Sequence, residues 1–344
     1  MATFLKQSKF IISSAPGQAP SDLVGDDLIE EGADHELRQF TVPDGQHGRR
    51  LDIVLTGAIS EFSRSYLQQI VESGMVKVNE VNVTKSSTRL RAGDRLVAEL
   101  RPTPQTLAFK PEPMVLDTVF EDDHILVINK PAGLVVHPAP GNWSGTLLNG
   151  LLARDAGAGL LPRAGIVHRL DKETSGLMVV ARTRQSMDAL VRMIAAREVS
   201  RQYLAVGQKR WSGPAFQLVE APVGRDPRNR LRMAVVDLSR QSGKLAATGI
   251  RLIQNGDHYC LVECALRTGR THQIRVHMAS LGHLLVGDAL YGGAPAGGLA
   301  RQALHAYHLA FMHPVTSQAL TFRTPVPADM RGAMELLGLS YNSV

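Results

Sequence analysis

Cysteine is nearly absent from this chain of 344 residues, which contains only Cys260 and Cys264. Both fall in one strand-like run, HYCLVECALR, where an i, i+4 pair lies far apart along the extended backbone. The sequence therefore predicts neither a disulfide framework nor a metal site. It also lacks an apolar run of about 20 residues, the length of a membrane span, and an apolar signal segment after Met1. We expect a cytoplasmic protein that does not associate with membranes.

Motifs for nucleotide cofactors are missing as well. No GxGxxG opens a helix, and GGAPAGG at 292–298 lacks the preceding strand and the Lys-Ser/Thr pair of a phosphate-binding loop. We therefore expect no cofactor. No GxSxG pattern supports a serine hydrolase. A zinc site at His272, His277 and His283 is disfavoured, because separations of five and six residues do not align ligands on one helical face.

Aromatic residues make up only 5% of the chain, which argues against an RNA-binding platform built from many rings. The distribution of charge along the chain is more informative than the net charge of +6, because the first forty residues hold seven acids and three bases. In the remainder 35 cations face 25 anions, a surplus of ten. Such a surplus favours a polyanionic partner.

The chain divides into four predicted parts. Residues 1–38 form an acidic extension without helix or strand periodicity, for which we expect disorder. Residues 39–101 form a small α/β unit with helices near 50–58 and 63–73, the second capped by Ser63. The proline-rich stretch 102–114 is a predicted linker. In residues 115–344 strands outnumber helices without alternating with them, which predicts an α+β fold with a mixed, mainly antiparallel sheet.

The stretch GIVHRLDKETSGLMVVAR at 165–182 is the first candidate for chemistry. It places Asp171 in a polar turn just ahead of an apolar strand, between Arg169 and Lys172. We expect these two cations to hold the carboxylate ionised, because a nearby opposite charge favours the charged form. The alternative is that Asp171 only opens a turn, which is the commoner role of an aspartate there.

Arginines gather at two further places. The stretch LRTGRTHQIRVHMASLGHLLVGDALYG at 266–292 leads from a strand into a helix near 272–281 and places Arg267, Arg270 and Arg275 around the turn. Arginine opposes the helix dipole there unless an anion is bound. The loop GRDPRNRLRM at 224–233 could hold phosphates through its arginines or simply be solvated.

Four ordered segments carry a resemblance to a known family. HRLDKETSGLMV, SRQYLAV, the 266–292 stretch and EDDHILVINKPAGLVVHPAPGNWSGTLLNGLL resemble the signature segments of RluA-type pseudouridine synthases. The N-terminal unit, RRLDIVLTGAISEFSRSYLQQIVESGMVKVNEVNVTK, resembles an S4 RNA-binding domain. Together they cover most of residues 40–325. The resemblance implies a cofactor-free isomerase of uridines in large-subunit ribosomal RNA, which flips out its target base.

The resemblance also implies roles for single residues. Asp171 would be the catalytic aspartate and Arg275 its partner, Arg169 would fill the space of the flipped uridine, and Tyr203 would stack on the target base. In the S4-like unit we expect RNA to contact Arg50, Ser63, Arg64, Gln68, Lys77 and Asn79. In the larger part we expect RNA contacts from His168, Arg225, Arg228, Arg230, Arg267, Arg270 and His272.

Other functions fit the sequence less well. The main alternative is an RNA-binding assembly factor without catalysis, which the joint presence of Asp171, Tyr203 and Arg275 disfavours. A glycosidase using Asp171 and Glu173 lacks the ~5 Å gap that a carboxylate pair needs. A methyltransferase lacks its glycine-rich cofactor loop. We expect a monomer acting on a ribosomal RNA stem-loop, free or in the assembling subunit.

Overall fold

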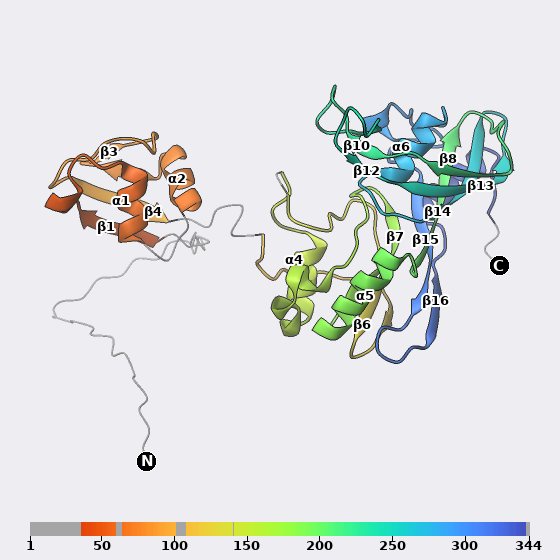
Figure 1. Ribbon diagram of the computed structural model, residues 1–344, viewed down its shortest axis with the longest axis horizontal. Helices are drawn as coiled ribbons and strands as arrows, with labels where there is room; N and C mark the ends of the chain where they lie inside the picture. The colour runs from red at the N-terminus through yellow and green to blue at the C-terminus, as the bar shows by residue number, and fades with distance from the viewer. Residues whose placement is uncertain (1–35, 60–63, 101–107, 140, 342–344) are drawn as a thin grey trace, which may run out of the picture. The chain divides into compact units, whose positions relative to one another are not determined.

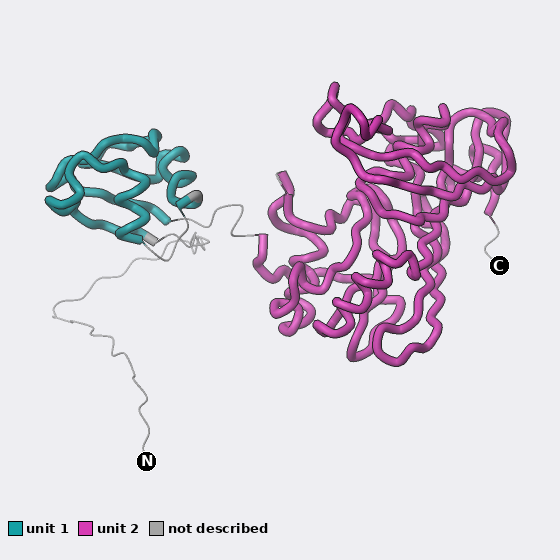
Figure 2. Tube along the Cα trace, in the orientation of Figure 1, with its two compact units in different colours: residues 1–101 teal, residues 102–344 magenta. Residues whose placement is uncertain are grey.

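The computed structural model describes residues 36–59, 64–100, 108–139 and 141–341, and the chain forms two compact units. The units are Met1–Arg101 and Pro102–Val344, drawn in different colours in Figure 2. Each unit has its own hydrophobic core and is described by itself.

The first unit is a four-stranded antiparallel sheet with two helices packed on it. Its strands run in the order β1-β4-β2-β3. They are β1 (Glu36–Thr41), β2 (Val76–Val78), β3 (Val81–Asn82) and β4 (Arg95–Leu100). The helices are α1 (Leu51–Ala58) and α2 (Arg64–Glu72), which bury Leu51, Leu55, Leu67 and Ile70 against the sheet.

The ends of this unit differ slightly from the sequence expectation. Strand β1 begins at Glu36, within the segment predicted as an extension, because its backbone pairs with β4 along its whole length. Helix α1 agrees with the predicted helix to within one residue. The helix cap predicted at Ser63 lies outside the described residues.

The second unit contains a nine-stranded sheet, drawn from yellow to blue in Figure 1. Eight strands follow the order β5-β6-β7-β15-β8-β14-β13-β9, and β16 pairs with β15. Their bounds are β5 (Thr118–Glu121), β6 (Ile125–Lys130), β7 (Ser175–Ala181), β8 (Ser200–Gln208), β9 (Phe216–Glu220), β13 (Ala247–Asn255), β14 (Tyr259–Leu266), β15 (Leu304–Met312) and β16 (Ala319–Arg323). The β7–β15 pair is parallel and the other pairs are antiparallel. The predicted mixed, mainly antiparallel α+β fold is confirmed.

A small second sheet and short helices complete this unit. The sheet has the order β11-β10-β12, with β10 (Val223–Arg225), β11 (Met233–Val235) and β12 (Gly243–Lys244). Three short 3-10 helices are η2 (Ala156–Leu160), η3 (Pro162–Gly165) and η4 (Ala289–Tyr291).

Helices cover both faces of the large sheet. Alternate residues of β6 and β7 pack on α5 (Arg184–Ala196) on one face and on α4 (Leu147–Arg154) on the other. At the other half, α6 (Gln273–Ser280) and α7 (Ala328–Leu336) cover opposite faces of β8 and β14. Because both faces are covered, β7 is buried throughout and is apolar apart from Ser175 at its start.

The single parallel pair depends on one glycine. Gly176 has φ +117°, and a Cβ there would collide with the backbone of Ala306 on β15. Only a residue without a side chain permits that approach and that backbone conformation. The pair fixes the start of β7, the strand that follows Asp171.

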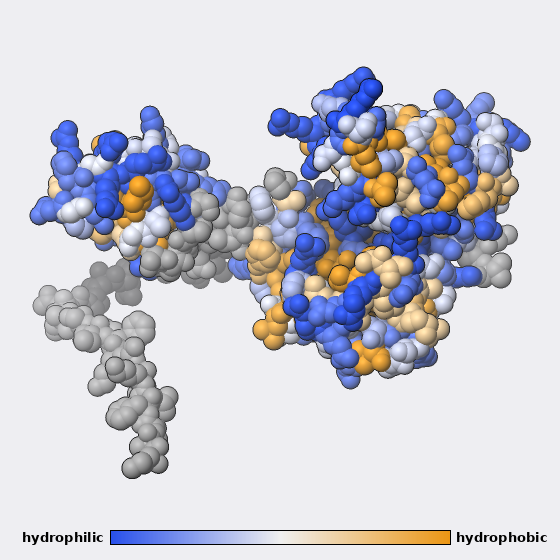
Figure 3. Space-filling model, viewed as in Figure 1, coloured by the Kyte–Doolittle hydropathy of each residue, from blue (hydrophilic) through white to orange (hydrophobic). Residues whose placement is uncertain are grey.

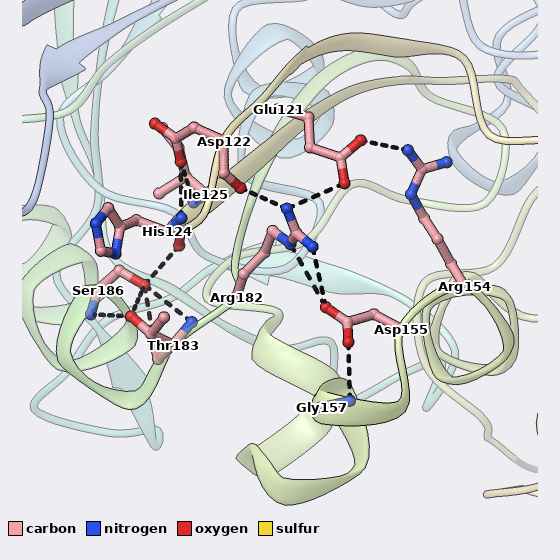
Figure 4. A network of polar contacts seen from close by, with 10 residues as sticks. All are labelled: Glu121, Asp122, His124, Ile125, Arg154, Asp155, Gly157, Arg182, Thr183 and Ser186. Atoms are coloured by element: carbon pink, nitrogen blue, oxygen red, sulfur yellow. Dashed lines mark hydrogen bonds and ion pairs between the residues drawn. The ribbon is translucent and has the colours of Figure 1, made fainter.

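A polar network holds the opposite end of β6 and β7 (Figure 4). Arg182, which follows β7, pairs with Glu121 at 3.2 Å and with Asp155 at 3.4 Å. Its guanidinium also donates to the carbonyl of Asp122. The network connects the β5–β6 turn to the end of α4. Strand β7 is thus held at its start by the pairing at Gly176 and at its end by Arg182.

Residues 108–114 of the predicted linker pack on the second unit. Ala108 is buried, and Asn149 of α4 donates to the carbonyl of Lys110 at 2.8 Å. Met114 occupies the space above Gly150 of α4. This part of the segment is therefore attached to the second unit.

Both cysteines are free thiols buried in β14. Burial raises the pKa of Cys260 to about 11 and raises that of Cys264 further. Among the described helices, none has the length and apolar character required to cross a bilayer.

Candidate active site

A cleft of about 780 Å³ lies in the second unit, and its charges are strongly biased. Among the described residues that line it, Asp171 is the one acid. Seven arginines line it as well, namely Arg163, Arg169, Arg197, Arg201, Arg267, Arg270 and Arg275. A basic cleft around one carboxylate attracts a polyanion and presents a single acid to it.

Asp171 opens a turn, and its carboxylate is free of that turn. Its backbone carbonyl accepts from Thr174 N–H at 3.1 Å, which closes the turn before β7. Its carboxylate instead accepts from Arg275 Nη1 of α6 at 3.0 Å. The side chain of Asp171 is 17% exposed, so one ion-paired carboxylate faces the cleft.

Backbone carbonyls of this turn are held from two sides. Lys130, at the end of β6, is fully buried and its Nζ donates to three carbonyls, those of Pro131, Leu134 and Lys172. On the other side Arg301 donates to the carbonyl of Glu173 at 3.1 Å. Lys172 and Glu173, the two residues after Asp171, are thus both held by hydrogen bonds to their carbonyls.

Arg275 is itself fixed by a second acid. Asp288 accepts from Arg275 Nε and Nη2, both at 2.7 Å, and the two side chains are 1% and 5% exposed. The Tyr291 ring lies 4.9 Å from the guanidinium carbon. Burial would lower the pKa of Arg275, but hydrogen bonds and charge from Asp288 and Asp171 outweigh it and raise that pKa. Arg275 is therefore a permanent cation with one nitrogen turned to Asp171.

The ion-pair partner of Asp171 is Arg275, which the family resemblance implied, and not a cation adjacent in sequence. In the described part of the chain neither Arg169 nor Lys172 forms an ion pair with it. Arg169 lines the same cleft, and Arg275, distant in sequence, is the cation that pairs with Asp171. His272 Nε2 lies 4.0 Å from the same carboxylate oxygen, and His272 Nδ1 lies 2.9 Å from the Tyr291 hydroxyl.

Tyr203 and the cleft histidines are uncharged at neutral pH. Burial raises the pKa of Tyr203 on β8 to about 12. Burial, together with nearby arginines, lowers the pKa of His137 to about 4 and of His168 to about 3. Burial also lowers the pKa of His272. The positive charge of the cleft therefore comes from arginine.

The predicted RNA-contacting residues of this unit fall into two groups. His168, Arg169, Tyr203, Arg267, Arg270, His272 and Arg275 line the cleft with Asp171. Arg225, Arg228 and Arg230 do not line it and belong to the β10–β11 hairpin. Figure 1 places this hairpin at the upper tip beside the label β10, and Figure 3 shows that tip as hydrophilic.

In the first unit three predicted RNA-facing residues converge on one buried acid. Asp52 accepts from Arg50 Nε at 3.0 Å, from Arg64 Nη2 at 2.8 Å and from Gln68 Nε2 at 2.7 Å. Burial would raise the pKa of Asp52, but these three hydrogen bonds outweigh it and lower the pKa. Asp52 thus orients two half-exposed arginines that the sequence did not connect with it.

The other predicted residues of this unit are placed differently. Lys77 is exposed on β2. Asn79 donates to Asp94 at 2.8 Å and accepts from Arg95 N–H at 2.9 Å, so its side chain braces a turn. Ser63 lies outside the described residues.

Three residues around the cleft were missed by the sequence analysis. They are Lys130, Asp288 and Arg201. Their neighbours in the sequence did not mark them as functional, because their roles depend on contacts with residues far away in the chain. The sequence held a partial signal for Lys130, since proline follows it directly and glycine stands two residues further on, which marks the end of a strand.

A mixed sheet that carries an arginine-lined cleft around an ion-paired aspartate fits an active site for a polyanion such as RNA. Residues 124–280 match the RNA pseudouridylate synthase family and residues 49–96 match the S4 domain family. The chain is 45% identical over 331 residues to the ribosomal large subunit pseudouridine synthase D of Neisseria meningitidis serogroup B, covering 93% of this chain and 87% of that protein. It is 47% identical over 326 residues to the protein of the same name from Xanthomonas campestris, covering 90% and 96%.

These relationships establish that the chain belongs to the RNA pseudouridylate synthase family and carries an S4 domain, as the sequence predicted. It is an RNA pseudouridine synthase. A solved structure, human RNA pseudouridylate synthase domain containing 4, shares the fold with a TM-score of 0.51 and 22% identity. That comparison covers 66% of this chain and 95% of the human chain.

Proposed function

We propose that this enzyme converts specific uridines of large-subunit ribosomal RNA into pseudouridine. Support for the substrate comes from the relatives named as ribosomal large subunit pseudouridine synthase D, which match nearly their whole length. Support for the chemistry comes from one observation, the single acid Asp171 paired with Arg275 in an arginine-lined cleft.

The reaction is an isomerisation, so its atoms balance without a co-substrate. The bond from uracil N1 to the ribose C1′ breaks and a bond from C5 to C1′ forms, while C5 loses a proton and N1 gains one. Asp171, held as a carboxylate beside Arg275, acts as nucleophile or base at the ribose or the uracil. The Arg275 guanidinium orients it and stabilises its negative charge.

Reaching the target requires that the nucleotide leave its stack. Extrusion costs a few kcal/mol, least in a loop. Arg169 is exposed at the cleft and takes the vacated position, where its guanidinium plane stacks on neighbouring bases. Tyr203 stacks on the extruded uracil, and its raised pKa keeps it a neutral ring. These assignments favour a stem-loop substrate.

Additional contacts hold the RNA around the reacting nucleotide. Arg267, Arg270 and His272 border the cleft, and Arg225, Arg228 and Arg230 extend from the hairpin. In the S4 domain Arg50, Arg64 and Gln68 form an Asp52-centred surface that binds RNA phosphates. We propose a monomer, for which size-exclusion chromatography with light scattering should give a mass near 37.3 kDa.

Replacing Asp171 with Asn tests the proposal. The variant should bind unmodified large-subunit RNA transcript with nearly wild-type affinity and form no pseudouridine, measured by carbodiimide treatment and primer extension. Asp188→Asn on the surface of α5 is the matched control and should remain active. Pseudouridine made by the Asp171→Asn variant would overturn the catalytic assignment.

The substrate is tested separately in cells. A pseudouridine map of ribosomal RNA from a strain lacking the gene should lose specific large-subunit sites that the wild-type gene restores. An unchanged map would refute the ribosomal substrate. RNA binding by the wild-type enzyme without any isomerisation would instead indicate an assembly factor.

A further inference from the structure

Arg201 is a buried cation that nothing in the described structure neutralises. It lies on β8, is 6% exposed, and lines the cleft. No carboxylate of the described residues lies within ion-pair distance, and its Nε is withdrawn from solvent without a hydrogen-bond partner. Arg275, in the same cleft, holds two carboxylates.

His168 places a second unused donor in the same cleft. Its Nε2 accepts from Val179 N–H of β7 at 3.0 Å, so the proton of the neutral ring is on Nδ1. Nδ1 is also buried without a partner among the described residues. His168 and Arg201 both line the cleft, and the charge of Arg201 adds to burial in lowering the pKa of His168.

Two buried donors and no acceptor define the missing ligand. A guanidinium withdrawn from water loses hydration free energy that only an anion or several oxygen acceptors restore. A scaffold position would be filled at lower cost by an apolar side chain. The ligand is therefore anionic and rich in oxygen acceptors, which for an RNA-modifying enzyme is a backbone phosphate.

The position of Arg201 fits a phosphate next to the reacting nucleotide. Arg201 and Tyr203 are two residues apart on β8, so both side chains leave the same face about 7 Å from each other. Gly269 gives the guanidinium room, because a Cβ there would lie 2.9 Å from Arg201 Nη1. A base on Tyr203 thus brings its adjoining phosphate toward Arg201.

We propose that Arg201 and His168 form a subsite for one of the two phosphates that flank the target uridine, an inference that rests on the proposed function. The subsite holds the nucleotide in its extruded position while Asp171 reacts. It binds a phosphate rather than a base edge, so it adds affinity and positioning without reading sequence.

The first test removes the charge. In the Asp171→Asn background, Arg201→Gln should weaken binding of the stem-loop about tenfold, the effect of losing a charge-assisted hydrogen bond. The slope of log affinity against log salt should also fall by nearly one phosphate contact. Arg251→Gln, an exposed arginine of β13 outside the cleft, is the matched control and should change affinity much less.

The second test asks which phosphate is bound. Stem-loops with a neutral methylphosphonate on the 5′ or the 3′ side of the target uridine should bind wild type about tenfold more weakly at one of the two positions. With Arg201→Gln that same substitution should cause no further loss. Equal and additive losses at both positions would overturn the subsite.

Two more variants separate folding from binding. Arg201→Lys keeps the positive charge but loses the paired N–H donors of the guanidinium. It should therefore retain part of the loss of affinity that the methylphosphonate causes in wild type. His168→Gln keeps an acceptor for Val179 N–H and a donor for the ligand, so it should lose less affinity than His168→Leu at similar thermal stability. Equal losses would exclude His168. Wild-type activity on the unmodified transcript reports independently on the proposed function.

Discussion

Asp288 grips Arg275 through both of its carboxylate oxygens at 2.7 Å, and Asp171 receives only the remaining nitrogen at 3.0 Å. Asp288 therefore sets the plane of the guanidinium, and Asp171, which is partly buried, pairs with the nitrogen that remains. Geometry of this kind positions a reactive carboxylate without blocking both of its oxygens.

Asp288→Asn should lower kcat about 10- to 100-fold with a small change in KM, because Asn cannot accept two charge-assisted hydrogen bonds from Arg275. Single-turnover kinetics and RNA affinity measure the two effects separately. Asp237→Asn, an exposed acid on a loop, is the control and should behave as wild type. A loss confined to RNA affinity would contradict the positioning role.

Lys130→Met should destabilise the turn that carries Asp171. The change leaves three carbonyls without their shared donor and should lower the free energy of unfolding by about 3 kcal/mol. The kcat should fall more than the RNA affinity, since the turn moves while the arginines of the cleft remain. Lys110→Met changes an exposed lysine and should leave stability and kcat intact.

Gly176→Ala should disrupt the parallel pairing of β7 with β15. The new Cβ would meet the backbone of Ala306, and φ +117° is unfavourable for alanine, so we expect a loss of at least about 3 kcal/mol in thermal or urea unfolding. Gly332→Ala is a matched control in α7, where a Cβ meets nothing within 4 Å, and it should be neutral or slightly stabilising. Wild-type stability of Gly176→Ala would show that the pair is dispensable.

Lowering the pH should reduce the free energy of unfolding before the carboxylates are protonated. Burial lowers the pKa values of His137, His168 and His305 to about 4, about 3 and about 4, whereas the unfolded chain protonates them near about 6.5. The unfolded state binds more protons between these values, so stability falls as pH decreases from about 6.5 to about 4, by at most about 1.4 kcal/mol per pH unit for each histidine.

Urea unfolding at about pH 7 and about pH 5 measures this dependence. His305→Gln should make the decline shallower, because one of the three groups is removed. Equal stability at the two pH values would contradict the burial of neutral histidines.

The sequence predicted the strands and the chemistry better than the contacts. Apolar period and glycine turns located β6, β7 and α6 to within a few residues, and Asp171 was recognisable from its motif. Local reasoning expected the adjacent cations to hold the Asp171 carboxylate, whereas the observed ion pair is with Arg275, the partner that the family resemblance implied. The sequence marked Lys130 as the end of a strand, but the contacts that Lys130 and Asp288 make could not be predicted, because they join strands and loops far apart in the sequence.

Both native thiols are inaccessible within β14 and hold their protons far above neutral pH. Alkylating reagents such as maleimides react with thiolates, so the wild-type protein should remain unlabelled while folded. A single cysteine introduced on the β10–β11 hairpin would then be the one reactive handle. A fluorophore there could report the arrival of RNA without first rebuilding the core.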